Sequence, residues 1–332
     1  MMMHASSCAR GGVITTRAQA INSPQSDVAS TRVVAPPALY RRRAAMLTLG
    51  IIGITSGVRP SIATEADDVF ERAVALQSKL VAAYDVQDFS QALATLRELR
   101  ELEPTRLAWI EGEATVSVDA KKFKDAIKCY GEALSATSDA GDLARLYAGR
   151  ALAHEGLYLF EDALRDYDAA LRLCVEGGFA PDPYILNSRG NVRGSLGDWA
   201  GAKEDYADSA ELFQGAKGLR RGASTTQRLD AAIYSASNAA LADVQLGNVD
   251  DALKKIEGLV RRAPNSADMR AAMAVLYYDI GRFEDAEDAW ERACSREAGC
   301  VKYKDIDYVQ RIRRWPPVMV TKLKAFLDVK QL

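Results

Sequence analysis

The chain is 332 residues long, with 43 basic and 45 acidic side chains, a formal net charge of −2 at pH 7 and two histidines. A chain without excess positive charge is poorly suited to binding a nucleic-acid backbone, whose phosphates supply most of the affinity. The sequence also contains no glycine-rich phosphate loop and no Cys-x-x-Cys pair. It therefore offers no recognisable constellation for catalysis or metal binding.

Residues 1–63 differ in composition from the rest of the chain. They contain seven arginines, no lysine and one acidic residue, Asp27, among many serines, threonines and alanines, a composition typical of an organelle transit peptide. Within them Arg41-Arg42-Arg43 precede an apolar run from Ala44 to Ile54, and Ser61-Ile62-Ala63 follows. A basic region, a short apolar region and small residues before the cleavage point are the parts of an export signal. The apolar run is eleven residues long, which is too short to span a membrane.

We therefore expect a two-part leader, a transit peptide over residues 1–40 and a twin-arginine signal over residues 41–63, with cleavage after Ala63. This order resembles the leader of plastid proteins that are exported to the thylakoid lumen. A single stromal or mitochondrial presequence with an incidental apolar patch is the alternative. Removal of this basic leader would make the mature chain more acidic, which again argues against an RNA ligand.

A helical pattern recurs six times after the leader. In its last copy Phe283, Ala286, Trp290 and Ala293 are spaced by 3, 4 and 3 residues, and Ala274 lies twelve residues before Ala286. Small residues at this interval let two antiparallel helices approach closely. Starting from the small residue of each first helix and adding 12, 16 and 19, the copies are Leu80/Ala92/Leu96/Leu99, Ala114/Ala126/Tyr130/Ala133, Ala151/Ala163/Tyr167/Ala170, Gly190/Ala202/Tyr206/Ser209, Ala240/Ala252/Ile256/Leu259 and Ala274/Ala286/Trp290/Ala293.

The alanines at the second position of this pattern are separated by 34, 37, 39, 50 and 34 residues. A period near 34 with this order of small and aromatic residues resembles the tetratricopeptide repeat family. The resemblance implies an all-α fold, a right-handed α-solenoid of about six helix-turn-helix hairpins over residues 64–300, followed by C-terminal capping helices. The repeats would span roughly residues 73–106, 107–140, 144–177, 183–216, 233–266 and 267–300. An ordinary helical bundle is the alternative, but it has no reason to keep a fixed interval.

Two segments depart from the repeat. Residues 215–228, between the fourth and fifth copies, are glycine-rich and include Lys217, Arg220, Arg221 and Arg228. They predict a loop that either docks an acidic partner or is only a flexible connection between the two repeats. Residues 301–332 carry eight basic and three acidic side chains and predict a basic cap over the last hairpin. The stretch Arg311–Pro317 in this cap is also a candidate contact for a membrane surface or an acidic protein.

In the tetratricopeptide repeat family the first helices of successive hairpins line a concave groove. By resemblance, the fourth to sixth repeats would present these side chains there: Tyr184, Asn187, Ser188, Asn191, Tyr234, Asn238, Asp268 and Tyr278. Aromatic and amide groups suit an extended peptide, so we expect a protein or peptide partner. Asp268 would repel a terminal carboxylate, which argues against the acidic tails that some members bind. A groove filled by the chain's own tail or by water is the alternative.

Other residues give little sign of chemistry. His154 occupies a first-helix position where the family packs an aromatic side chain, so we interpret it as a core residue. We expect no catalytic residue, metal, cofactor or small-molecule substrate. Cys294 and Cys300 are close enough in sequence for a disulfide in an oxidising compartment, and free buried thiols are the alternative.

These observations predict a noncatalytic scaffold or assembly factor in the thylakoid lumen that binds a partner protein in its groove and no nucleic acid. A role in photosynthetic complex biogenesis follows only by analogy with plastid members of the family. A factor of the stroma or of the thylakoid membrane periphery, held at the membrane by residues 301–332, is the alternative. A subunit related to prenyltransferases is a third interpretation, which the missing zinc site and tryptophan signature disfavour.

Overall fold

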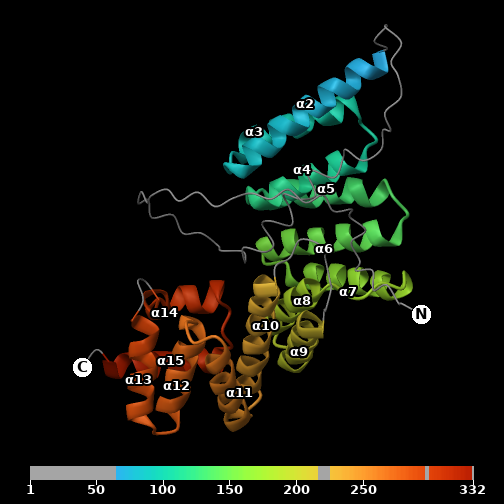
Figure 1. The fold of residues 1–332 in the computed structure, drawn as a ribbon. Helices are drawn as coiled ribbons and strands as arrows, with labels where there is room; N and C mark the ends of the chain where they lie inside the picture. The colour runs from blue at the N-terminus through green and yellow to red at the C-terminus, as the bar shows by residue number, and fades with distance from the viewer. Residues whose placement is uncertain (1–64, 216–224, 296–298, 331–332) are drawn as a thin grey trace. The chain divides into compact units, whose positions relative to one another are not determined.

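A computed structural model describes residues 65–215, 225–295 and 299–330. The expected leader with its cleavage point at Ala63 lies outside the described residues, as do Lys217, Arg220 and Arg221 of the expected loop. The last residues of that loop, from Thr225 onward, instead begin a helix. All regular elements of the described chain are helical, without a β-strand, which confirms the predicted all-α class of stacked helical hairpins (Figure 1).

The described helices fall into two compact units that divide between Pro181 and Asp182. The N-terminal unit contains the pairs α2 (Glu65–Asp85) and α3 (Phe89–Leu102), α4 (Leu107–Asp119) and α5 (Phe123–Ser135), and α6 (Ala140–Gly156) and α7 (Phe160–Glu176). The C-terminal unit contains the pairs α8 (Pro183–Ser195) and α9 (Trp199–Gly215), α10 (Thr225–Gln245) and α11 (Val249–Arg262), and α12 (Ala267–Asp279) and α13 (Phe283–Cys294). It continues with α14 (Val301–Lys304), a π-helical turn η2 (Tyr308–Ile312) and α15 (Pro317–Lys330).

The repeated alanines explain why these helices pair. All six are at most 1% exposed, at the contact between the two helices of each pair: Ala92, Ala126, Ala163, Ala202, Ala252 and Ala286. In the fourth pair the first helix carries Gly190, where an added Cβ would lie 2.7 Å from Cε1 of Tyr206. A ring in that position leaves no room for a side chain, so the pattern records helix–helix packing rather than ligand chemistry.

The turn inside each helix pair contains one residue with positive φ. In the N-terminal unit these residues carry side chains: Gln87 (62°), Lys121 (61°) and Tyr158 (59°). In the C-terminal unit they are glycines: Gly197 (87°), Gly247 (86°) and Gly281 (78°). Glycine adopts this conformation without steric cost, whereas other residues are disfavoured there. The same turn therefore costs more in the N-terminal unit.

Two hairpins also contain an ion pair between a partly exposed arginine and a buried aspartate, which the repeat pattern does not predict. Arg150 donates to Asp166 with Nε and Nη2 at 2.8 and 2.6 Å, and Arg189 donates to Asp205 with the same atoms at 2.9 and 2.6 Å. In both cases the arginine precedes the small residue of the first helix and the aspartate precedes the tyrosine of the second. Each pair thus joins the two helices of its hairpin with a bidentate contact.

The C-terminal unit buries its core around its last two hairpins and the segment that follows them. Trp315, Met319, Leu323 and Phe326 are all at most 3% exposed and belong to the same apolar cluster as α10 to α13. Helix α15 lies against α12 (Figure 1) and also contacts α10. No described helix combines the length and the apolarity that a membrane crossing requires. The apolar side chains of α15 are instead used inside this unit.

Candidate functional site

The predicted contact residues lie on the first helices of the C-terminal unit, α8, α10 and α12, and we call the surface that they form the first-helix face. Side chains join these helices. The Asn187 Oδ1 on α8 accepts hydrogen bonds from Ser235 Oγ and Asn238 Nδ2 on α10, both at 3.2 Å. Ser235 also lies 3.0 Å from the hydroxyl of Ser209 on α9. A polar network thus runs across the face.

The C-terminal segment extends this network to α12 through Arg313, which is 8% exposed. Its Nε and Nη2 donate to the two carboxylate oxygens of Asp268 at 2.9 and 2.6 Å. Its Nη1 donates to Asn238 Oδ1 at 2.8 Å, and Nη2 also donates to Ser237 Oγ at 3.3 Å. The guanidinium carbon lies 4.8 Å from the ring centroid of Tyr234. All these partners come from α10 and α12.

The electrostatics of this contact favour the charged form of Arg313. Burial alone would lower the Arg313 pKa, but the carboxylate of Asp268 outweighs it and leaves the pKa above its usual value. A buried charge is tolerated only when it is paired and hydrogen-bonded. Asp268 and the amide of Asn238 meet this requirement.

The backbone of the segment is shaped to bring two side chains to Asp268. The π-helical turn is followed by Arg314 at φ 55°, a conformation that is uncommon for a residue with a side chain. The Arg313 N–H donates to Tyr308 O at 2.9 Å and the Trp315 N–H to Val309 O at 3.0 Å. The Trp315 indole then donates to Asp268 Oδ1 at 3.2 Å, so one carboxylate holds both side chains.

Helix α15 anchors the end of this segment. The Val318 N–H donates to Gln245 Oε1 of α10 at 3.0 Å, and Lys322 Nζ pairs with Asp279 Oδ2 of α12 at 2.5 Å. The ring of Phe326 packs 5.6 Å from that of Tyr278 and 5.2 Å from that of Trp290. The predicted contact residue Tyr278 is therefore covered by the cap.

The other predicted contact residues have partners within the fold. Tyr184 packs edge to face on Phe213 at 4.7 Å, and Asn191 Oδ1 accepts from the Tyr206 hydroxyl at 2.9 Å. Ser188 is partly buried, and Tyr234 remains 38% exposed although Arg313 covers one side of its ring. On the fifth and sixth hairpins the first-helix face thus holds the chain's own tail, the alternative that the sequence left open.

Comparison with known proteins agrees with this architecture. Residues 237–298, from the middle of α10 to beyond α13, match the tetratricopeptide repeat family model. The stacked hairpins thus form a fold like that of tetratricopeptide repeat proteins. None of the curated proteins compared with it matches.

Several solved structures share the fold of this chain. A tetratricopeptide repeat protein from Parabacteroides merdae is 20% identical, with a TM-score of 0.52 over 77% of this chain and 93% of its own. The apo form of RapI is 11% identical, with a TM-score of 0.54 over 80% and 98% of the two chains. BtubC from P. vanneervenii is 21% identical, with a TM-score of 0.50 over 66% and 89%. At these identities the likeness concerns the fold alone.

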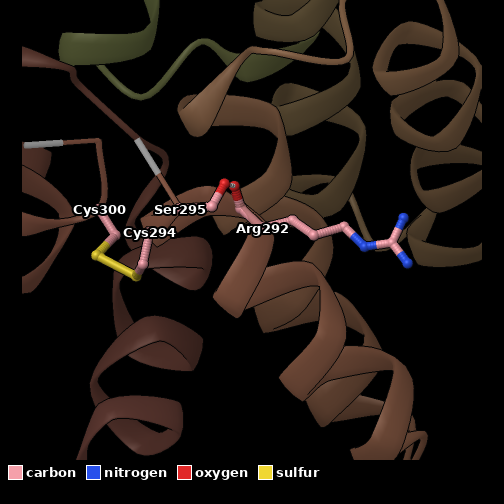
Figure 2. The surroundings of a disulfide bond; sticks show 4 residues. All are labelled: Arg292, Cys294, Ser295 and Cys300. Atoms are coloured by element: carbon pink, nitrogen blue, oxygen red, sulfur yellow. Dashed lines mark hydrogen bonds between the residues drawn. A yellow bond between two sulfur atoms is a disulfide. The ribbon is translucent and has the colours of Figure 1, made fainter. Parts of the chain in front are cut away.

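The two cysteines singled out in the sequence are joined in the structure. Cys294 ends α13, Cys300 precedes α14, and a disulfide links them with their Cα atoms 4.7 Å apart (Figure 2). Beside it the Ser295 hydroxyl donates to the carbonyl of Arg292 at 2.8 Å, while the Arg292 side chain points away from the sulfurs. The bond fixes the start of the C-terminal segment to the last hairpin.

The basic stretch proposed for a membrane or an acidic protein is only partly on the surface. Arg313 and Trp315 are buried against Asp268, whereas Arg311 is exposed and pairs with Asp307 at 3.4 Å. Sequence reasoning missed this role of Arg313. Asp268 could have indicated it, because a carboxylate that repels the carboxylate of a peptide terminus attracts a guanidinium.

Proposed function

We propose that this chain is a noncatalytic scaffold that binds a segment of another protein on the first-helix face of its C-terminal unit. One observation carries the proposal. The face already holds a polypeptide segment that is not part of a hairpin, residues Asp305–Trp315, through side chains of α10 and α12. The hydrogen bonds and the ring contact that hold this segment are interactions that could also hold a segment of another protein.

The residues concerned supply three kinds of contact. Asp268 provides a charged acceptor, Asn187 and Asn238 provide amide groups, and Tyr234 provides a flat ring in a residue that is 38% exposed. Amides can pair with the backbone of an extended ligand, and aromatic rings give large contact area at low entropic cost. Such a mixed surface suits protein recognition.

The proposal is tested by photo-crosslinking from the face. A photoreactive phenylalanine replaces Tyr234, and in the control it replaces Lys254, whose side chain is 75% exposed on the second helix α11. Each full-length variant is irradiated in extract of the source cells, the crosslinked segment is mapped by mass spectrometry, and a synthetic copy is titrated against the wild-type chain. We expect a mapped segment from position 234 alone that binds in the titration. Identical products from both positions, or a synthetic segment without affinity, would refute it.

We further propose that the mature protein acts in the thylakoid lumen, in the assembly of photosynthetic complexes. The arginine-rich leader, the triple arginine before the apolar run and the small residues ending at Ala63 support this location. Determining the N-terminal residue of the protein from fractionated organelles tests it. A start at Thr64 in the soluble lumen fraction is expected, whereas a start before Arg41 would place the protein in the stroma or the mitochondrial matrix.

A further inference from the structure

We propose that the segment Asp305–Trp315 is an intramolecular competitor for the first-helix face, and that the partner segment which the face takes carries an arginine followed two residues later by an aromatic residue. This inference rests on the proposed function and specifies the chemistry of the ligand.

The guanidinium site is built entirely by side chains of the first-helix face. Asp268 receives two parallel hydrogen bonds, Asn238 and Ser237 receive one each, and Tyr234 offers its ring to the cation. Ser237 and Asn238 are at most 5% exposed. The planar fork of an arginine fills such a site, whereas the point charge of a lysine cannot reproduce the bidentate geometry.

The aromatic residue two positions after the arginine has a subsite of its own. The Trp315 indole shares Asp268 with Arg313 and stacks on the ring of Tyr303, with centroids 5.8 Å apart. Tyr303 lies three residues after Cys300, which the disulfide holds on α13. The aromatic subsite therefore combines Asp268 of α12 with a tyrosine that stays tethered when the following residues move.

The segment Asp305–Trp315 can leave the face while the rest of the cap stays in place. It lies between two anchors, the disulfide at Cys300 and helix α15 with Met319, Leu323 and Phe326 in the core. Its departure removes Val309, Arg313 and Trp315 from buried positions. A ligand with the same arginine and aromatic residue restores the contacts of the last two. Exposed residues earlier in the segment, such as Asp307 and Gln310, need no counterpart in the ligand.

The test uses the full-length chain and a fluorescein-labelled peptide Arg-Ile-Arg-Arg-Trp-Pro-Pro, which copies residues 311–317. Binding is followed by fluorescence anisotropy. An occupied face lowers apparent affinity in proportion to the fraction of open molecules, so Arg313→Ala should bind at least tenfold more tightly than wild type. Adding Asp268→Asn to that variant should remove the gain. The control Arg311→Ala changes an exposed side chain of the same segment and should bind like wild type.

Equal affinities of wild type and Arg313→Ala would overturn the proposal, as would a gain that survives Asp268→Asn. Should Arg313→Ala fail to fold, Arg313→Lys replaces it, because this variant keeps the charge and loses the bidentate contact. It should bind the peptide at least threefold more tightly than wild type, and no gain would again overturn the inference. A segment crosslinked at Tyr234 that lacks the arginine and aromatic pair would refute this ligand chemistry and leave the scaffold function standing.

Discussion

The contact between Arg313 and Asp268 can be weighed by a double-mutant cycle. Asp268→Ala leaves a guanidinium that is 8% exposed without its carboxylate, and breaking a buried pair from one side costs about 3–5 kcal/mol. Arg313→Met keeps most of the side-chain volume and leaves the carboxylate of Asp268 with the Trp315 indole at 3.2 Å, so about 1–3 kcal/mol is expected. The double variant has no charge left unpaired. We therefore expect its cost to be at least about 2 kcal/mol less than the sum of the two.

Native-state hydrogen exchange of the amides of α12 is the suitable assay, because repeat arrays unfold locally and a global midpoint does not isolate one hairpin. A control is Lys254→Met, which removes an exposed partner of Asp251 and should change the opening free energy by less than about 0.5 kcal/mol. If the costs of the two single variants sum to that of the double variant within about 0.5 kcal/mol, the two side chains are not coupled. That result would contradict the buried contact between Arg313 and Asp268.

Further predictions concern the disulfide, the turns and the partly buried His154. Reducing Cys294–Cys300, a loop of six residues, should lower the stability of the C-terminal unit by about 2 kcal/mol, and a Ser/Ser variant that melts like the oxidised chain would contradict this. Lys121→Gly should stabilise the N-terminal unit by up to about 1 kcal/mol, and Gly281→Ala should destabilise the C-terminal unit similarly, in denaturant titrations; the opposite signs would refute the turn analysis. Burial lowers the pKa of His154 below its usual 6.5. As the pH drops below about 6.5, the unfolded chain therefore takes up a proton before the folded chain does, and the free energy of unfolding should fall. His154→Phe should flatten this decline between pH 7 and 5, and an unchanged slope would assign the decline to other groups.

The hairpins could be predicted from the sequence because their cause is local. A helix pair that packs closely needs small residues at a fixed interval, and Ala92 to Ala286 obey that need with essentially complete burial. The pattern of small residues lies within each repeat, and it can be recognised because it recurs along the chain. The start of α10 at Thr225 was not predicted, because the repeat pattern carries no information on how far an insertion extends a helix.

The occupant of the face could not be predicted in the same way. The contact between Arg313 and Asp268 joins residues 45 positions apart. It occurs once, so no repeating sequence pattern indicates it. The basic residues near Trp315 equally suit a surface, and only the fold tells that Arg313 faces inward while Arg311 stays exposed. The same limit holds for Asn191 and Asn238, whose amides resemble ligand contacts but bond to Tyr206 and Arg313.

The most direct test of the central claim is hydrogen exchange on the wild-type chain with and without a saturating concentration of the peptide that copies residues 311–317. If ligand and tail share the first-helix face, amides of Asp305–Trp315 should exchange faster in the presence of the peptide, while those of α10 and α12 stay protected and those of α2 to α7 do not change. Saturable binding that leaves the exchange of Asp305–Trp315 unaltered would place the ligand elsewhere and contradict the account.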